Sequence, residues 1–346
     1  MGTPNAYRPY LLSILLLAAM IFLSIAVGSV FIPLEKILQV IGQRLRGIPP
    51  ELRSTDLSPF DTILFDLRLP RTAMTALVGA ALACSGGAYQ GLFRNPLADP
   101  YLIGVASGAG LGAMVAISFH WPRTFLGLLA VPVSAFVGAM FTVLAVYTLS
   151  KVGRSVPPST LILAGVAVSS FASALTSFLL IHASGEIRRA IHWLLGGAMM
   201  SGWQPVLAVL PYILGGCAVL LAMGHALNVL QFGDEQAQQL GLPAVWVRRV
   251  VITAASLATA AAVSFSGIIG FVGLVVPHIV RLVWGSDYRR LLSLALINGA
   301  AFLLAADILA RSILAPEELP VGIITALAGA PFFLWVLRRA KQQNMW

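Results

Sequence analysis

Charged residues are scarce in this sequence, and their scarcity decides the class of protein. Asp, Glu, Lys and Arg make up 10% of the 346 residues, whereas a soluble domain carries about 25%. Apolar residues make up 58%, and the mean hydropathy is +0.89. So few charges cannot cover the surface of a water-soluble chain of this length, so the composition favours a membrane protein.

Several other features are missing. The two cysteines, Cys84 and Cys217, each lie inside an apolar segment, where we expect small buried side chains rather than a metal site. There is no GxxxxGK[ST] phosphate loop, so the chain itself is not expected to hydrolyse ATP. There is also no His-Glu-x-x-His motif and no Gly-x-Ser-x-Gly in a hydrolase context. We therefore predict no catalytic residue, no metal and no other cofactor bound by this chain.

Ionisable residues within the apolar segments are nearly absent, apart from Asp307 near the end of one segment. Carriers driven by protons or sodium usually need such groups. A secondary transporter is the alternative from a different class, and it would leave the polar stretch 233–243 without a role. An intramembrane enzyme would need paired Ser/His or Asp/Asp groups within the bilayer, which the sequence does not offer.

Long apolar runs are what the sequence has in abundance. Runs of about 20 residues, long enough to cross ~30 Å of hydrocarbon as a helix, recur along the whole chain. They predict an all-α membrane protein in which residues 1–346 form one polytopic domain of about ten transmembrane helices. We expect these helices at 10–31, 72–92, 101–119, 125–150, 159–181, 205–226, 246–266, 270–285, 291–310 and 321–337.

The predicted spans also give an orientation. The first apolar run is longer than the core of a signal peptide, so it is interpreted as a retained helix. An even number of spans puts both termini on one side, and Arg338, Arg339 and Lys341 after the last span indicate that this side is the cytoplasm. The one long connection, 32–66, includes a stretch at 33–47 whose helical spacing of apolar and charged residues is typical of a surface helix.

A series of short motifs identifies a family that the sequence resembles. Taken in order, the motifs are Arg68-Leu-Pro-Arg71, Asn95-Pro-Leu-Ala-Asp-Pro100, Gly104 to Gly110, Trp193-Leu-Leu-Gly-Gly197, Gly233 to Pro243, Gly270-Phe-Val-Gly-Leu-Val-Val-Pro-His278 and Glu318-Leu-Pro-Val-Gly322. In this order and spacing, from about Arg68 to the end, the chain resembles the FecCD-like permease subunits of type II ABC importers for iron-siderophores, haem or vitamin B12.

The resemblance implies an assembly. It implies a bundle like the permease of the vitamin B12 importer, present as a homodimer or paired with a sister permease in the lipid of a bacterial or archaeal cytoplasmic (inner) membrane. Two separate ATPase subunits would bind ATP and Mg²⁺, and a periplasmic or lipid-anchored binding protein would deliver the substrate. No nucleic acid partner is implied. An iron chelate, either a siderophore complex or haem, is the preferred cargo, and cobalamin is the alternative.

Three arginines, Arg68, Arg71 and Arg311, fall on the outer side by the parity of ten spans. One interpretation is anchoring at the membrane interface, where arginine reaches toward headgroups. Positive charge on the outside opposes the usual bias, however, and calls for another cause. The resemblance implies that these arginines dock the binding protein by pairing with its carboxylates. Asp307, four residues before Arg311, is expected to share its helix face and orient it.

The polar stretch 231–243 is too polar to be a span. Gly233 and Gly241 bracket a short helix whose first turn carries two acidic residues, which the backbone dipole favours there. The plain interpretation is a solvated connector. The resemblance implies a coupling helix that sits in a cleft of the ATPase, with contacts from Gly233, Asp234, Glu235, Gln236, Leu240, Gly241 and Leu242.

The fifth predicted span is rich in small and hydroxylated residues. Five of them are expected to share one side of the helix, namely Gly165, Ser169, Ser173, Thr176 and Ser177. Small residues of this kind often pack helices together in membranes. The resemblance implies instead that this helix lines the translocation pathway of the dimer. His192, Trp193 and the pair Gly196-Gly197 follow it and are candidates for an outer gate.

Overall fold

The computed structural model describes residues 7–28, 32–46, 58–119, 125–153, 156–183, 185–197 and 202–343. Within these ranges the chain is helical and forms no β-strand, which confirms the predicted all-α fold. The first half contains α1 Arg8–Ala26, α2 Leu34–Leu45, α3 Ser58–Thr62, η2 Ile63–Arg68, α4 Leu69–Leu92, η3 Pro100–Ile103, α5 Val105–Ser118 and α6 Phe125–Leu149. The second half contains α7 Pro158–His182, α8 Ile187–Leu194, α9 Trp203–Ala222, α10 Gly224–Leu230, α11 Asp234–Gln239, α12 Ala244–Ser266, α13 Val272–Trp284, α14 Tyr288–Ser312 and α15 Val321–Gln343.

Each of the ten predicted spans contains a helix, although the lengths vary. In the described residues, seven helical stretches are long and apolar enough to cross a membrane, and three further apolar helices are shorter. The shorter ones are α5, α13 and the apolar part of α15, Val321–Val336. The α5 segment is short because Gly104, with φ of 85°, separates it from the 3₁₀ turn of η3.

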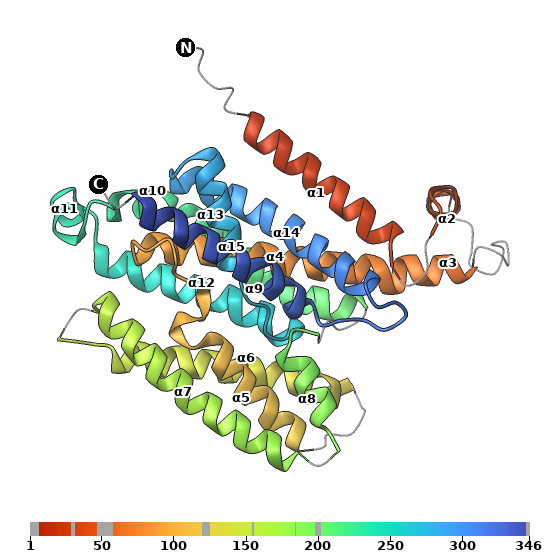
Figure 1. Cartoon of the computed structure of the whole chain (residues 1–346), viewed down its shortest axis with the longest axis horizontal. Coiled ribbons are helices and arrows are strands. Elements are labelled where there is room, and N and C mark those ends of the chain that lie inside the picture. The colour runs from red at the N-terminus through yellow and green to blue at the C-terminus, as the bar shows by residue number, and fades with distance from the viewer. Residues whose placement is uncertain are drawn as a thin grey trace.

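The ends of several predicted spans need correction. The helix expected to begin near residue 72 is continuous with α3 and η2, and this stretch runs from Pro59 to Leu92. The first helix ends at Ala26, and residues 29–31 of its predicted span lie outside the described residues. Helix α2 occupies most of the predicted surface segment, whose last residue, 47, also lies outside them. It is seen end-on beside the bundle in Figure 1, so its axis crosses the long helices steeply.

Helix α4 lies at the centre of the bundle. It packs against α9, α12, α13 and α14. Of the 18 most apolar consecutive residues in the stretch Pro59–Leu92, which contains α4, 83% are buried, compared with 17% in α7. Glycines allow the closest crossings, because a Cβ at Gly79 would overlap the carbonyl oxygen of Gly299 on α14, and one at Gly86 would overlap that of Gly273 on α13. Such small-residue contacts let membrane helices approach without a large apolar core between them.

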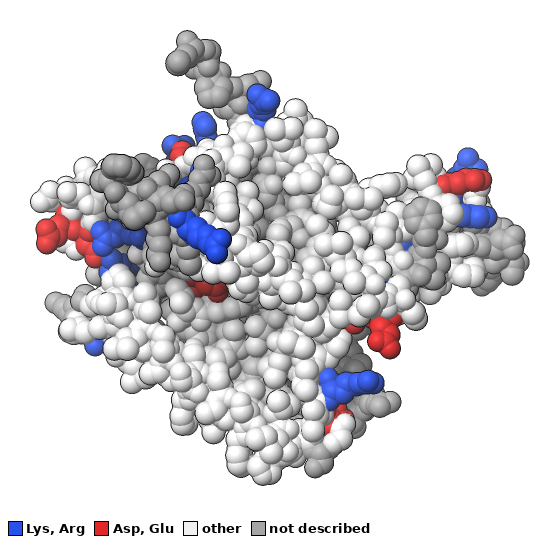
Figure 2. Space-filling model, in the orientation of Figure 1, with Lys and Arg blue, Asp and Glu red and all other residues white. Residues whose placement is uncertain are grey.

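The long helices give the molecule two ends. The start of α1, helices α10 and α11, the start of α14 and the end of α15 lie at one end, here called the α11 end (Figure 1). A hydrogen bond of 2.9 Å between Tyr10 Oη and Ser293 Oγ joins α1 to α14 there. The opposite end, here called the arginine end, holds α8 and the connection between α14 and α15. Figure 2 shows that the charged side chains on the visible face gather toward these two ends, with an almost uncharged band between them.

Candidate functional site

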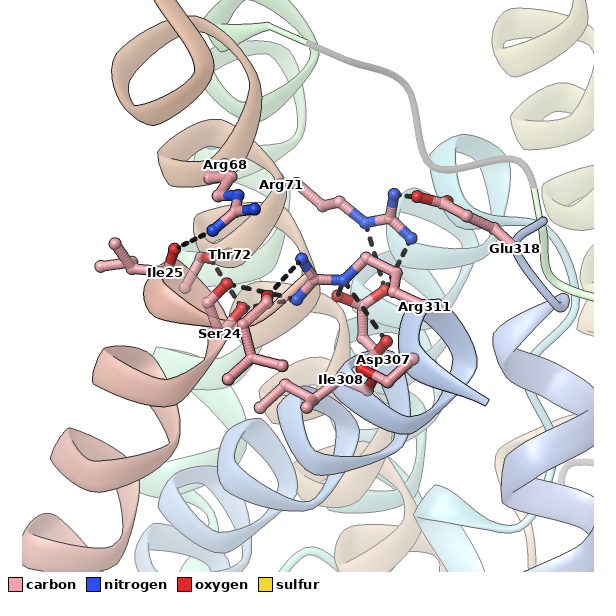
Figure 3. A network of polar contacts seen from close by, with 11 residues as sticks. Ser24, Ile25, Arg68, Arg71, Thr72, Asp307, Ile308, Arg311 and Glu318 are labelled. Carbon is pink, nitrogen blue, oxygen red and sulfur yellow. Dashed lines mark hydrogen bonds and ion pairs between the residues drawn. The ribbon is translucent and has the colours of Figure 1, made fainter. Parts of the chain in front are cut away.

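The three predicted outer arginines come together at the arginine end (Figure 3). Arg68 is the last residue of η2, Arg71 lies in the first turn of α4, and Arg311 lies in the last turn of α14. Residues more than 230 positions apart in the sequence therefore form one polar cluster, because α4 and α14 pack side by side. We call these residues, with Asp307 and Glu318, the arginine cluster.

Two of these arginines, Arg68 and Arg311, are turned inward rather than toward the surface. Arg68 is 7% exposed, and its Nη1 donates to the carbonyl oxygens of Ile25 at 2.6 Å and Ala26 at 2.9 Å. Arg311 is 4% exposed, and its two terminal nitrogens donate to the carbonyl oxygens of Ser24 and Val27 at 3.3 and 3.2 Å. The last carbonyls of a helix lack partners within it, and both arginines satisfy those of α1.

Asp307 connects Arg71 and Arg311 from the buried side of the cluster. Its carboxylate is fully buried, and its Oδ1 accepts from Nε and Nη2 of Arg71 at 3.2 and 2.9 Å. Its Oδ2 lies 2.9 Å from Nε of Arg311, an ion pair that is not aligned as a hydrogen bond. The expected role of Asp307 in orienting Arg311 agrees with this contact. Removing this buried carboxylate would leave two guanidiniums without their shared partner, which is costly inside a protein.

Arg71 is the member of the three that reaches the surface. Its side chain is 24% exposed, and its Nη1 donates to Oε2 of Glu318 at 2.7 Å. Glu318 lies in the connection before α15 and is 42% exposed. Glu318 belongs to the last of the sequence motifs, but its role could not be predicted, because nothing in the spacing places it opposite Arg71.

At the α11 end, the predicted polar helix is present. Gly233 and Gly241 flank it with φ of 105° and 80°, conformations that favour glycine. One side of the helix is fixed to the bundle by the buried Ala237 and by Asp234, whose two oxygens accept from Nη2 of Arg248 at 2.6 and 2.7 Å. Arg248 was not predicted, and a basic residue fourteen positions later is too weak a signal to find it.

The other side of α11 is open. Glu235, Gln236 and Gly241 are exposed, and Leu242 is half-buried. Large apolar side chains are exposed beside them, with Leu240 at 69% and its neighbours Phe232 and Trp246 also open. The exposed polar residues of α11 lie near these apolar groups in the chain, a combination typical of a surface that another protein covers.

A cavity of about 630 Å³ opens at this end, between the end of α4, the residues that follow α10 and the start of α14. Arg94, Gln231 and Asp287 are among the residues that line it. Burial acts to raise the pKa of Asp287, but the hydrogen bond from Asn228, the backbone N–H of Arg289 and nearby positive charge lower it below its ordinary value. Asp287 therefore stays ionised in a pocket that also presents an exposed arginine.

The five small residues predicted to share one side of α7 lie within about a third of its circumference, but their surroundings differ. Gly165 packs against the carbonyl oxygen of Leu102 in η3, and Thr176 is 9% exposed, so both are covered by this chain itself. Ser169 is half-buried and accepts a hydrogen bond from Ser107 at 3.1 Å. The stripe spans about 120° of the helix at 100° per residue, wide enough for its two edges to have different neighbours.

Ser173 and Ser177, at the far edge of that stripe, are exposed. The hydroxyl of Ser177 donates to the carbonyl oxygen of Ser173 at 3.0 Å, so neither residue is tied to another helix by this contact. These two serines are the members of the predicted set that a water-filled pathway could reach.

Helix α8 follows α7 at the arginine end. Trp193 is buried, whereas His192 is exposed. With Arg188, Phe265 and other residues they line a cavity of about 540 Å³. The glycine pair packs tightly, because a Cβ at Gly197 would overlap the ring of His192. In the described residues, no group of three or more His, Cys, Asp and Glu side chains is arranged to hold a metal ion.

Comparison with solved structures agrees with this architecture. An ABC transporter of the metal-chelate type, solved in an inward-facing conformation, superposes with a TM-score of 0.79 and 30% sequence identity. The match covers 96% of this chain and 98% of the other. The fold is therefore shared over nearly the whole length of both proteins.

Curated relatives have matching lengths. The uncharacterised ABC transporter permease YvrB of Bacillus subtilis is 43% identical over 97% of this chain and 94% of its own. The cobalamin import permease BtuC of Halobacterium salinarum is 49% identical over 80% of this chain and 73% of its own. The hemin transport permease HmuU of Yersinia pestis is 40% identical over 82% of this chain and 85% of its own. The model of the FecCD transport family matches residues 16–339, and the chain belongs to this family.

Proposed function

We propose that this chain is the transmembrane permease subunit of a binding-protein-dependent ABC importer that moves an iron chelate, either a ferric siderophore or haem, into the cytoplasm. The match to the FecCD transport family over residues 16–339 carries this proposal. The similarity to permeases named for hemin and for iron chelates supports the cargo. In this assignment, ATP and Mg²⁺ bind a separate ATPase, and this chain forms the path through the membrane.

The α11 end is proposed to face the cytoplasm and bind the ATPase. The open side of α11, with exposed Leu240 and Phe232 next to Glu235 and Gln236, supports this role. Asp234 then acts within the chain, by holding α11 against Arg248. The start of α1 and the end of α15 lie at this end (Figure 1), so this orientation agrees with the expected cytoplasmic termini.

The arginine end is proposed to receive the binding protein on the outside. Arg71 is the contact, because its guanidinium reaches the surface. Arg68 and Arg311 contribute positive charge from below and hold the end of α1, which fixes the surface around Arg71. Several charges in one interface steer encounter and orientation more than they add affinity.

The pathway is proposed to run along the exposed face of α7, between two copies of this chain or between this chain and a sister permease. The 17% burial of the α7 window, low for a central segment of the chain, supports an uncovered face that another subunit completes. We expect single cysteines at Ser173 and Ser177 to react with a small polar thiol reagent in a nucleotide-dependent way. A cysteine at Thr176 should stay protected, and the reverse pattern would contradict this placement.

Cobalamin is a second candidate cargo. The 49% identity to a cobalamin import permease favours it, although that match covers 73% of the relative. The two cargoes differ in shape and charge but share a transport machinery, so the motifs of the permease do not separate them.

Reconstituted transport tests both the machinery and the cargo. The permease, its ATPase and its binding protein are placed in proteoliposomes and supplied with a labelled ferric siderophore, haem or cobalamin. We expect uptake that needs ATP and the binding protein and that is strongest with an iron chelate. Uptake driven by an ion gradient without ATP would favour a secondary transporter, and uptake of cobalamin alone would assign the second cargo.

A further inference from the structure

The guanidinium of Arg71 has two sides, and they meet two different carboxylates. Its Nε and Nη2 contact Asp307, whose side chain is fully buried. Its Nη1 contacts Glu318, whose side chain is 42% exposed (Figure 3). The inner contact is sealed inside the protein, whereas solvent and any docking protein can reach the outer one.

The other two arginines of the cluster are much less exposed. Arg68 and Arg311 are almost completely buried, and their donors bind the carbonyl oxygens at the end of α1. A carboxylate that approaches the cluster from outside therefore meets the outer side of Arg71. The position that such a carboxylate needs is already held by Glu318.

We propose that Glu318 is an internal substitute for a carboxylate of the binding protein, and that docking exchanges one carboxylate for the other on Nη1 of Arg71. The inference rests on the docking role proposed above. The exchange keeps the charge balance, since one ion pair breaks as an equivalent one forms on the same nitrogen. Asp307 stays in place, because its removal would leave buried charge without a partner.

The position of Glu318 gives the exchange a consequence inside the fold. The backbone N–H of the next residue, Leu319, donates to the carbonyl oxygen of Ala310 at 3.0 Å, which fixes the chain where it turns into α15. In the first turn of α15, a Cβ at Gly322 would overlap the carbonyl oxygen of Leu195, directly after α8. A docking protein that releases Glu318 thus acts on the segment that enters the contact between α15 and α8.

Affinity measurements test the exchange. The permease and its ATPase are held in lipid nanodiscs, and binding of the purified binding protein of the same importer is measured. Glu318→Gln removes the competing charge and keeps the shape. An exposed ion pair is favoured by about 1.5- to 5-fold, so we expect binding to tighten by about that factor. Glu317→Gln, which removes the same charge from the neighbouring exposed residue, should leave the affinity unchanged.

Variants of Arg71 separate this inference from the docking role itself. Arg71→Gln should weaken docking, and Glu318→Gln added to it should have no further effect. Arg71→Lys, which keeps a charge beside Asp307 but cannot bridge two carboxylates, serves if the first variant does not fold. Unchanged docking in the Arg71 variants would refute the docking role. Weakened docking there, with Glu318→Gln no tighter than Glu317→Gln, would refute only the exchange.

Discussion

The two ends of the molecule carry similar polar residues and use them in opposite ways. At the arginine end, three arginines converge, and two of them are buried against the carbonyl oxygens of α1. At the α11 end, a short polar helix is held by one ion pair, and its other side stays open. In the arginine cluster, Arg71 and Glu318 are the members that reach the surface, whereas α11 is open along one side.

The difference follows from how each end is built. The arginine end is where α1, α4 and α14 finish or begin together, so the unsatisfied carbonyls of one helix lie within reach of side chains from the others. The α11 end has a connection of its own, which leaves the bundle and returns between α10 and α12. We expect substitutions to affect folding at the first end and association with the ATPase at the second.

The largest expected effect is at Asp307. Asp307→Asn leaves Arg71 and Arg311 without their shared buried carboxylate, and removing one partner of a buried pair costs about 3–5 kcal/mol. We expect this loss in the unfolding free energy of the purified permease in detergent, measured by thermal or chemical unfolding. Glu318→Gln, at the exposed side of the same cluster, should cost about 0–1 kcal/mol. Equal stability of the two variants would mean that the buried contacts of Asp307 do not stabilise the arginine end.

The next effect should appear at the α11 end without any loss of folding. Leu240 is 69% exposed, and Leu240→Asp places a charge in the apolar surface proposed to bind the ATPase. We expect ATPase affinity to fall by about tenfold or more, since few apolar contacts carry most of an interface. Leu314→Asp, the same change at an exposed leucine of the arginine end, is the matched control. An equal effect of both substitutions would contradict the assignment of the two ends.

Much of the fold could be predicted, because the bilayer restricts it. Apolar length and the need to satisfy backbone hydrogen bonds define the spans, and a helix occupies each of the ten predicted ranges. Counting the predicted spans also put Arg68, Arg71 and Arg311 on the same side of the membrane, and the three lie at one end of the bundle. The predictions failed where a break depends on tertiary contacts, as at Gly104, which separates η3 from α5 in the third span.

The direction of side chains could not be predicted. The sequence places Arg311 near a helix end, but whether it faces water or α1 depends on how α1 and α14 pack. The same limit applies to α7, where Thr176 faces the bundle and Ser177, the next residue, does not. Consecutive helical residues differ by 100°, so an error of one residue in the orientation of a helix reverses such an assignment.

A smaller effect is expected from the ion pair that holds α11. Asp234→Lys replaces a carboxylate that pairs with Arg248 by a second positive charge. A partly exposed pair of this kind contributes about 1 kcal/mol, so the helix should loosen while the bundle stays folded. We expect faster amide hydrogen exchange in 234–239 and reduced stimulation of the ATPase by the binding protein. Unchanged exchange there would show that other contacts hold α11.

The smallest effect is expected at the neighbouring residue, Glu235. Its side chain is exposed, and it contributes through its place in the first turn of α11, where a negative charge gains a few tenths of a kcal/mol from the helix dipole. Glu235→Lys should therefore leave hydrogen exchange in 234–239 close to that of the unaltered protein, in contrast to Asp234→Lys. Coupled ATP hydrolysis is the second measurement, because Glu235 lies on the open side that faces the proposed ATPase. A moderate loss of coupled ATP hydrolysis, with amide exchange in 234–239 unchanged, would assign Glu235 to the interface. Equally faster exchange in both variants would mean that α11 responds to its net charge rather than to the contact with Arg248.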